Sequence, residues 1–419
     1  MKKSGLKTVY LRFCVTILGL TLISCQSPPA GLKIGTLLPI SGDLSSYGAS
    51  MQNTAQLLVT TVNACGGVLG NPVTLFSEDD QTEPAAGAAA MTKLAEVNRV
   101  AAVVGGASSA VSNATVLIAV RNQVVQISPS STSPSFTERA RKGEFKGFWF
   151  RTAPPDTFQA KAIAQLAYKR GVRSLAVLAV NNDYGSGLIN AFIPAFQALG
   201  GKVLNAETPT RFDPRAASFD SEVRQAASPR PDAVLLVSYP ETGSIILRTA
   251  FELGVLGQNT QWIATDGLKD QRLAELVGKS KDRKYIVAGL EGTAAHAAGN
   301  AFKDFRDRFV QAYKTEPAIY DPNTWDAMAL TVLAAESAKS LTGTGIRDHL
   351  RTVSNPPGEA VTDVCQGLDL LRKGKKINYQ GASGTVDLNQ QGDVVGSYDI
   401  WQIQPNGSIK ILETLEIKH

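Results

Sequence analysis

Small hydroxyl side chains cluster in two loops of the chain, Gly105-Gly106-Ala107-Ser108-Ser109 and Ser128-Pro129-Ser130-Ser131-Thr132-Ser133-Pro134. Each loop follows a short β-branched run. Hydroxyls, together with free amides at a helix start, bind carboxylates because the helix dipole also favours negative charge there. The hydroxyls of these two loops are therefore candidate ligands for an anionic group. Helix capping at the first loop and a plain turn at the second are the structural alternatives.

Aromatic residues and one acid occupy the corresponding loops of the second half. Tyr184 lies between Asp183 and Gly185, Tyr239 precedes Pro240, and Asp266 precedes Gly267. Such Asn-, Gly- and Pro-rich loops are poor core positions, so the tyrosines are candidates for covering a ligand. Asp266 is the acid of this set, with an ordinary Asp-Gly turn as the structural alternative.

These loops belong to a repeating pattern of strands and helices. Short β-branched runs, from 32–37 through 175–180 and 233–237 to 285–288, alternate with helical stretches of ten to fifteen residues. Such alternation predicts βαβ units and parallel sheets, that is, a doubly wound α/β fold. Because such sheets bind ligands beyond the carboxyl ends of their strands, both sets of loops are expected at a ligand cleft.

Enzymatic motifs are missing from the sequence. It contains no Gly-x-Ser-x-Gly, Walker or His-Glu-x-x-His pattern, and 185–187 lacks the third glycine of a dinucleotide loop. The 3 histidines are too dispersed for a metal cluster. The acidic run 78–80 is typical of a solvated strand end rather than a cation site. We therefore expect no enzymatic activity, metal or cofactor, and a hydrolase is a distant third possibility.

The N-terminus is typical of an export signal. A basic start is followed by an apolar stretch that is too short and too charged to span a membrane. Leu22-Ile23-Ser24-Cys25 resembles a bacterial lipobox, which predicts a signal peptide at 1–24, lipidation of Cys25 and a linker at 25–30. An ordinary signal with an incidental cysteine is the alternative.

Composition limits the remaining possibilities. The chain has 419 residues, too many for one core, so at least two lobes are expected. Of its 42 basic residues, which face 37 acidic ones, four lie in the leader, so the exported chain is close to neutral and a nucleic-acid partner is not indicated. Apart from the cysteine of the leader and that of the lipobox-like motif, the chain contains Cys65 and Cys365. In an oxidising compartment we expect these two to form a disulfide.

An ordered set of short motifs gives a more specific resemblance. The chain resembles type I periplasmic binding proteins of the leucine/isoleucine/valine-binding family across nearly all of its length after the leader. The motifs that carry the resemblance include Leu37-Leu38-Pro39-Ile40-Ser41-Gly42, Asn63-Ala64-Cys65-Gly66-Gly67-Val68, Ser77-Glu78-Asp79-Asp80, Arg151-Thr152, Asp183-Tyr184-Gly185, Asp266-Gly267 and Trp325-Asp326-Ala327.

The resemblance implies two doubly wound parallel-sheet lobes joined by three crossings. Crossings near Thr152, Gly289 and Gly384 would give an N-terminal lobe of 31–152 and 290–384. The C-terminal lobe would comprise 153–289 and 385–419. A ligand would lie in the cleft between the lobes, and hinge closure would trap it.

The resemblance also assigns roles to the loop residues. A ligand carboxylate would meet Ser109 and Thr132, with the backbone of Ser108 and Ser130 nearby, and a ligand ammonium would meet Asp266. Tyr184 would cover the ligand backbone. The remaining cleft walls would be Tyr47, Tyr239 and Trp325. The leucine-binding branch has Trp at the position of Tyr47 and Ala at that of Ser130, so the side-chain preference stays open.

Two classes of function remain. The first is an extracytoplasmic, membrane-anchored binding protein that delivers a neutral or branched-chain amino acid to the permease subunits of an ABC transporter. The second is a binding protein or sensor for urea, amides or another small polar solute, which would signal through a partner. The sequence leaves the ligand, the anchoring membrane and the oligomeric state open.

Overall fold

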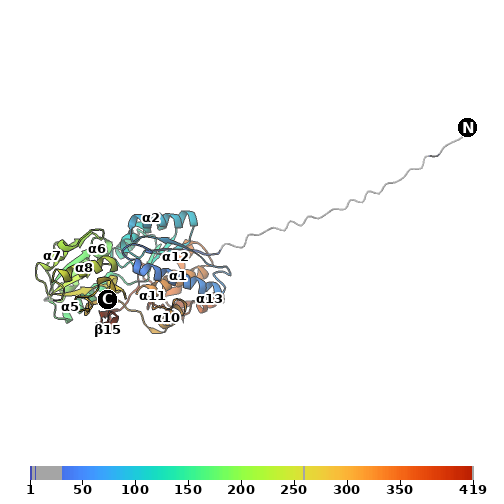
Figure 1. The fold of residues 1–419 in the computed structure, drawn as a ribbon. Helices are drawn as coiled ribbons and strands as arrows, with labels where there is room; N and C mark the ends of the chain where they lie inside the picture. Colours follow the sequence, from blue (N-terminus) through green and yellow to red (C-terminus); the bar gives the residue numbers. More distant parts are fainter. Residues whose placement is uncertain (2–4, 6–30, 258–259, 418–419) are drawn as a thin grey trace. The chain divides into compact units, whose positions relative to one another are not determined.

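The computed structural model describes residues 1, 5, 31–257 and 260–417. The chain divides into two units, Met1–Ala30 and Gly31–His419, and the second contains the fold (Figure 1). The predicted signal peptide (apart from Met1 and Gly5), Cys25 and the linker therefore lie outside the described residues. Within the described part of the chain, no helix has the length and apolar character needed to cross a membrane.

The first sheet contains five parallel strands in the order β2-β1-β3-β4-β5. Its strands are β1 (Lys33–Leu38), β2 (Thr74–Asp79), β3 (Ala102–Gly105), β4 (Val125–Ser128) and β5 (Trp149–Arg151). The inner strands β3 and β4 are buried throughout, as expected of parallel strands covered by helices on both faces.

The second sheet has eight strands and is mainly parallel. Its path is β15-β14-β11-β10-β9-β6-β7, with β8 also pairing with β6. Its strands are β6 (Ser174–Val180), β7 (Lys202–Val203), β8 (Thr210–Phe212), β9 (Ala233–Val237), β10 (Gln261–Ala264), β11 (Glu291–Ala295), β14 (Tyr398–Ile403) and β15 (Ile409–Leu415). Only β14 and β15 run antiparallel to their neighbours. The predicted fold class, an α/β fold built on two doubly wound parallel sheets, is confirmed.

Helices from both halves of the sequence pack around the first sheet. Figure 1 shows α1 beside α10–α13, which are more than two hundred residues later in the chain. The helices of this region are α1 (Ser45–Ala64), α2 (Pro84–Thr92) with a π-helical continuation (Lys93–Asn98), α3 (Ser109–Arg121), α4 (Ser135–Arg141), α10 (Gly299–Tyr313), α11 (Asp321–Ala338), α12 (Gly343–Ser354) and α13 (Val364–Arg372). A two-stranded sheet is formed by β12 (Glu359–Val361), which lies between α12 and α13 in sequence, and β13 (Ile377–Tyr379), which follows α13.

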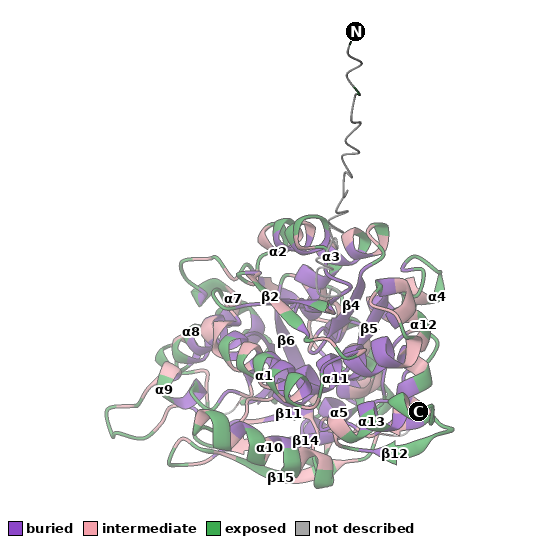
Figure 2. Cartoon of the chain, turned by 90° about the vertical axis from the view of Figure 1, so that its right-hand side faces the viewer, coloured by how far each residue is buried: buried purple, intermediate pink, exposed green. Residues whose placement is uncertain are grey.

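The helix α11 is buried along almost its whole length (Figure 2). Its Ala-rich sequence allows neighbours to approach closely on all sides, and it packs against α1, α12 and α13. The second sheet is covered by α5 (Asp156–Lys169), α6 (Asp183–Ala198), α7 (Asp220–Ala227), α8 (Pro240–Glu252), α9 (Leu273–Val277) and the 3₁₀ turn η2 (Asp266–Leu268).

The chain passes between the two regions at places that differ from the predicted crossings. The crossing expected near Gly289 comes before β11, which pairs with β10 inside the second sheet, so the passage follows Ala295. The crossing expected near Gly384 also comes early, because Val386 and Val394 still pack in the core of the first region. The motif resemblance located these crossings only approximately because the neighbouring glycines mark turns as well as hinges.

One predicted strand is wrong. Residues 285–288 form successive turns, in which Ala288 N donates to Tyr285 O at 3.1 Å and Leu290 N donates to Val287 O at 3.0 Å. Val287 is nevertheless buried in the second core. A short apolar run can fill a core from a turn, so its composition alone does not distinguish the two cases.

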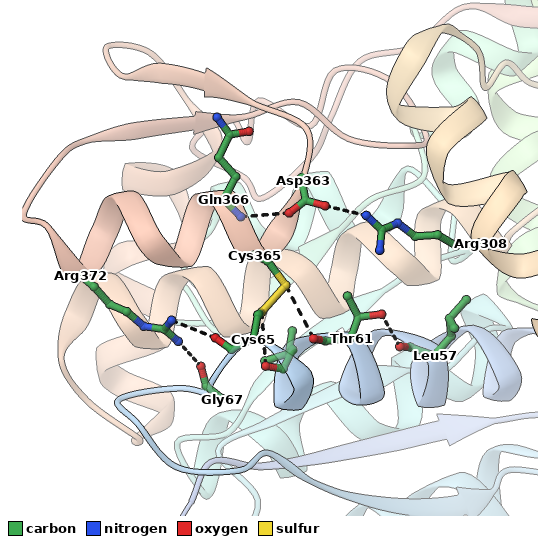
Figure 3. Close-up of a disulfide and its surroundings, with 10 residues drawn as sticks. Leu57, Thr61, Cys65, Gly67, Arg308, Asp363, Cys365, Gln366 and Arg372 are labelled. Atoms are coloured by element: carbon green, nitrogen blue, oxygen red, sulfur yellow. Dashed lines mark hydrogen bonds and ion pairs between the residues drawn. A yellow bond between two sulfur atoms is a disulfide. The ribbon is translucent and has the colours of Figure 1, made fainter.

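A disulfide joins Cys65 at the end of α1 to Cys365 in α13 (Figure 3). Their Cα atoms are 5.9 Å apart, although 300 positions separate them in sequence. Arg372 strengthens the same junction by donating to the carbonyl oxygens of Cys65 at 3.0 Å and Gly67 at 2.6 Å. The bond therefore ties the late helices to the first helix of the same region.

Candidate ligand-binding site

A pocket lies where loops at the carboxyl ends of the two sheets meet. The segments that come after β1, β3 and β4 of the first sheet form one side of the pocket. The segments that come after β6, β9 and β10 of the second sheet form the other side. The residues that line it are Leu44, Tyr47, Met51, Ala107, Ser109, Ser130, Tyr184, Tyr239, Asp266, Gly267 and Tyr320. The fold therefore brings together hydroxyls from one loop set and the acid and aromatics from the other.

Ser109 is the first residue of α3 and is positioned to donate into the pocket. Its Oγ accepts a hydrogen bond from Ser133 N at 3.3 Å. Within the described residues its own O–H donates to no protein acceptor, so the hydrogen is available to a ligand. The dipole of the 13-residue helix α3 adds positive potential at the same point.

The hydroxyls of Ser108 and Ser130 are engaged within the protein. Ser108 Oγ accepts from Ala110 N at 3.3 Å as the N-cap of α3 and lies 3.2 Å from the Tyr239 hydroxyl. Ser130 Oγ donates to Ala107 O at 3.1 Å. The capping alternative thus holds for Ser108, and Ser130 fastens the two hydroxyl-rich loops to each other.

Thr132 and a residue that the sequence analysis missed, Asp156, form a buried polar cluster. Asp156 is the first residue of α5, and its backbone N–H donates to Thr132 O at 2.8 Å. Apart from each other, Thr132 Oγ1 and the two carboxyl oxygens of Asp156 are buried without a hydrogen-bond partner among the described residues. One hydroxyl cannot satisfy both carboxyl oxygens, and unsatisfied buried polar atoms are costly, so this cluster indicates a place for a polar guest.

The charge state of Asp156 depends on its surroundings. Burial raises its pKa well above the ordinary value, and the nearby Asp266 carboxylate raises it further. The Thr132 hydroxyl and the Arg151 charge act in the opposite direction. A cation placed between the two acids would favour the ionised form of Asp156.

Asp266 is held by two phenols. Its Oδ1 accepts from the Tyr184 hydroxyl at 2.7 Å, and its Oδ2 accepts from the Tyr320 hydroxyl. The Tyr184 oxygen also lies 2.8 Å from Thr265 Oγ1. Asp266 is buried, with 4% of the residue exposed, and the orientation of its carboxyl group is fixed by these bonds.

The same phenols stay neutral. Burial raises the pKa of both Tyr184 and Tyr320 well above the usual value, and the Asp266 charge raises each further. Neutral phenols remain hydrogen-bond donors to Asp266 but do not cancel its negative charge. Asp266 is therefore the group of the second-sheet wall that a positively charged ligand group could pair with.

The remaining wall is mostly apolar. Leu44 and Met51 line the pocket beside Tyr47, whose ring makes an edge contact with Tyr320 at a centroid distance of 6.0 Å. Tyr184 and Tyr239 stack at 5.5 Å. A ligand side chain in this part of the pocket would meet aliphatic carbon and aromatic rings.

Trp325 does not line the pocket. It lies in α11, and its ring packs 5.5 Å from Phe305 in the core of the first region. Tyr320 occupies the wall instead, as the residue just before α11. Five positions along a helix correspond to a rotation of about 140° from the starting face, so Tyr320 and Trp325 point in different directions.

Local sequence gave little sign of Asp156 or Tyr320. Asp156 follows Pro154-Pro155, a context typical of an ordinary acidic first helical turn. Tyr320 precedes Asp321-Pro322, which marks only a helix start. The usable signal was position: Asp156 comes directly after a predicted crossing, and Tyr320 comes directly before a helix. Both kinds of place lie near a cleft.

The pocket is closed by contacts between the two regions. The Tyr47 hydroxyl donates to Gly267 O at 3.3 Å. Asp43 Oδ1 accepts from Thr242 N at 2.8 Å and from Thr242 Oγ1 at 2.6 Å. The described structure is therefore a closed arrangement of the cleft.

Comparison with protein families gives one match over most of the chain. The family model described as the receptor family ligand binding region matches residues 50–406. A similar relative is the chemotactic signal transduction system substrate-binding protein BasB of Halobacterium salinarum. It is 27% identical over 393 residues, which cover 92% of this chain and 89% of the relative.

Two solved structures show similar folds. A leucine binding protein, LivK, from Thermotoga maritima superposes with a TM-score of 0.77 at 27% identity, covering 92% of this chain and 99% of that one. A solute binding protein of an ABC transporter from R. palustris, solved in complex with benzoate, superposes with a TM-score of 0.72 at 19% identity. That match covers 92% of this chain and 96% of the other.

Proposed function

The chain belongs to the receptor ligand-binding-region family, as a type I periplasmic solute-binding protein related to the Leu/Ile/Val-binding proteins, and from this we propose that its ligand is a neutral α-amino acid. In this proposal the closed cleft holds the zwitterion, and the lobes open to release it to the permease subunits of an ABC transporter. The apolar wall around Leu44 and Met51 favours an aliphatic side chain of the branched-chain type.

The observation that carries this proposal is a pair of opposite electrostatic partners in one small pocket. Ser109 at the N-terminus of α3 would bind the ligand carboxylate. Asp266 would bind the ammonium group. Thr132, which the resemblance placed at the carboxylate, would join Asp266 there, because its hydroxyl lies beside Asp156 and Asp156 lies near Asp266. Each charged end of a buried zwitterion needs such a partner to offset its desolvation.

Uncharged and purely anionic ligands fit this arrangement less well. Urea or a short amide would leave Asp266 without a charge partner. An aromatic acid such as the benzoate bound by the R. palustris relative has no positive end to offer it. The acid is therefore the residue that discriminates between these classes.

A ligand screen followed by titration tests the proposal. We expect a thermal-shift screen of the twenty amino acids, urea, acetamide and benzoate to select an aliphatic amino acid. With that ligand, Asp266→Asn should cost about 3–5 kcal/mol, roughly 10²–10³-fold or more in affinity by calorimetry. Asp213→Asn, an exposed acid in the same region, is the control. Unchanged affinity in Asp266→Asn would contradict the assignment.

A sensory role is the second candidate, because the relative BasB is named as part of a chemotactic system. It would use the same site and differ only in the partner that reads the closed form. Crosslinking the ligand-bound protein in its native membrane would separate the roles: capture of a permease subunit supports transport, and capture of a chemoreceptor supports sensing.

We also propose that Cys25 carries a lipid that anchors the exported protein to a membrane. The lipobox-like Leu22-Ile23-Ser24-Cys25 supports this. Mass spectrometry of the N-terminal peptide should show an acyl modification on Cys25 that is lost in Cys25→Ser. An unmodified N-terminal cysteine in the wild-type protein would exclude the anchor.

A further inference from the structure

A buried guanidinium lies directly beneath the hydroxyl-rich loop of the pocket. Arg151, the last residue of β5, has no exposed surface. Its Nε donates to Asp393 Oδ1 at 2.7 Å, and its Nη2 donates to Thr137 Oγ1 at 2.8 Å. Its Nη1 donates to two backbone carbonyls, Ser131 O at 3.1 Å and Ser133 O at 2.9 Å.

Those two carbonyls flank Thr132. The carbonyl of Thr132 itself accepts from Asp156 N, so three successive carbonyl groups of the loop are held by hydrogen bonds, two of them from Arg151. The Thr132 hydroxyl, by contrast, has no partner among the described residues other than the neighbouring Asp156 carboxyl. The position of that hydroxyl is therefore set by contacts made beneath the loop.

The other end of the network reaches the connection to the second sheet. Asp393 Oδ2 accepts from Thr137 Oγ1 at 2.8 Å, and Arg151 N donates to Gly392 O at 2.9 Å. A few residues later the chain enters β14 of the second sheet. On its other side, Arg151 directly precedes the connection to α5, so it touches two of the chain's passages between the sheets.

Arg151 makes more hydrogen bonds than its ion pair with Asp393 requires. A buried ion pair can often be replaced by apolar residues of similar volume without loss of stability. What an apolar pair cannot supply is the planar set of donors that reaches a carboxylate, a hydroxyl and two carbonyls at once, and a lysine cannot supply it either.

We propose that Arg151 is a positioning residue for ligand binding. It holds Thr132 in place through Ser131 and Ser133, and through Asp393 it links this ligand contact to the passages about which the lobes close. The expected effect of Arg151 on ligand affinity rests on the proposed function. Its consequence for the loop is independent of any ligand.

The test uses three variants of the full chain. Arg151→Met combined with Asp393→Leu replaces the ion pair by apolar side chains. Arg151→Lys keeps a positive charge beside Asp393 but loses the fork of donors. Thr137→Val is the matched control, because it disturbs the same ion pair and leaves the bonds to the two carbonyls intact.

The first measurement is hydrogen exchange of the ligand-free protein. In the double variant and in Arg151→Lys, the peptide covering 128–134 should exchange at least several-fold faster, with protection of β6 and β9 unchanged. Thr137→Val should keep the loop protected. Wild-type protection of 128–134 in both Arg151 variants would overturn the proposal whatever the ligand proves to be.

The second measurement is the affinity for L-leucine, with the melting temperature as the structural readout. The double variant should melt within a few degrees of wild type but bind at least about tenfold more weakly, as expected when one hydrogen bond to a charged ligand group is misplaced. Thr137→Val should bind within about threefold of wild type. If the wild-type protein does not bind L-leucine, that result counts against the proposed function alone. Wild-type affinity in the stable double variant would overturn the role of Arg151.

Discussion

Asp80, just beyond the end of β2, has a fully buried carboxyl group with only one hydrogen-bonded oxygen. Its Oδ1 accepts from Thr82 N at 2.8 Å, and Oδ2 is buried without a partner among the described residues. Burial raises the pKa of Asp80 to about 7. The neutral acid is therefore the form that suits this position.

The contribution of Asp80 to stability should consequently fall as the pH rises from about 4 to about 7. In that range the unfolded chain has released the Asp80 proton while the folded chain still holds it, so deprotonation drives unfolding. The stabilisation present at low pH, up to about 4 kcal/mol for this one group, is lost as the pH passes the folded-state pKa. Denaturant titrations of wild type and Asp80→Asn between pH 4 and 8 should show a flatter pH dependence in the variant, and parallel curves would exclude this role.

A phenol of the pocket offers a second test at the scale of one residue. Tyr320→Phe keeps the ring that contacts Tyr47 but removes the donor to Asp266 Oδ2. If the ligand ammonium depends on a fixed Asp266, affinity should fall by about 1.5–3 kcal/mol, the usual contribution of a hydrogen bond to a charged group. Trp325→Phe, which alters a core residue of α11, should change the melting temperature and leave affinity alone. Equal affinities for Tyr320→Phe and wild type would show that Asp266 does not need this bond.

At the scale of elements, the helix α8 obtains its N-terminal cap from the other region. Its own N-cap residue, Tyr239, makes no side-chain cap, and Asp43 from the first region accepts from Thr242 N and Oγ1 instead. Because this contact joins the two regions, we expect it to form only when the cleft closes. By contrast Asp363 caps α13 within one region, by accepting from Gln366 N at 2.9 Å.

Removing each cap should therefore have a different effect. Asp43→Ala should weaken ligand binding by about 0.5–2 kcal/mol, the usual value of a cap, with little change in the melting temperature of the ligand-free protein. Asp363→Ala should lower the melting temperature and leave affinity unchanged. Calorimetry and thermal melts of the two variants check this, and a stability loss without an affinity loss in Asp43→Ala would argue against a cap that forms on closure.

For the whole molecule, the strands of the two sheets were easier to predict from the sequence than the places where the chain passes from one sheet to the other. Strands such as 233–237 were predictable because each is a continuous apolar run between polar helices. The assignment of β11 and of the segment around Val394 was not, because pairing partners far apart in sequence decide it. The same holds for the site: Asp266 and Tyr184 follow strands, whereas the roles of Asp156 and Arg151 depend on where the passages lie.

The closed cleft is the property of the whole molecule on which the function depends, and one glycine gives access to it. Gly187 in α6 faces the loop after β4, and a Cβ atom at this position would lie 2.6 Å from Ser133 Oγ and 2.9 Å from the rigid Pro134 ring. Gly187→Val should therefore obstruct closure without disturbing either sheet, because the added methyl groups point into the gap between the regions.

In small-angle scattering, saturating ligand should reduce the radius of gyration of wild type and of the control Ala198→Val, whose side chain is exposed at the end of α6. Gly187→Val should keep the wild-type melting temperature without ligand, stay expanded when ligand is added, and bind at least about tenfold more weakly, since a ligand gains affinity only in so far as the closed state is accessible. A Gly187→Val protein that compacts and binds as wild type does would mean that the ligand does not require this closed arrangement.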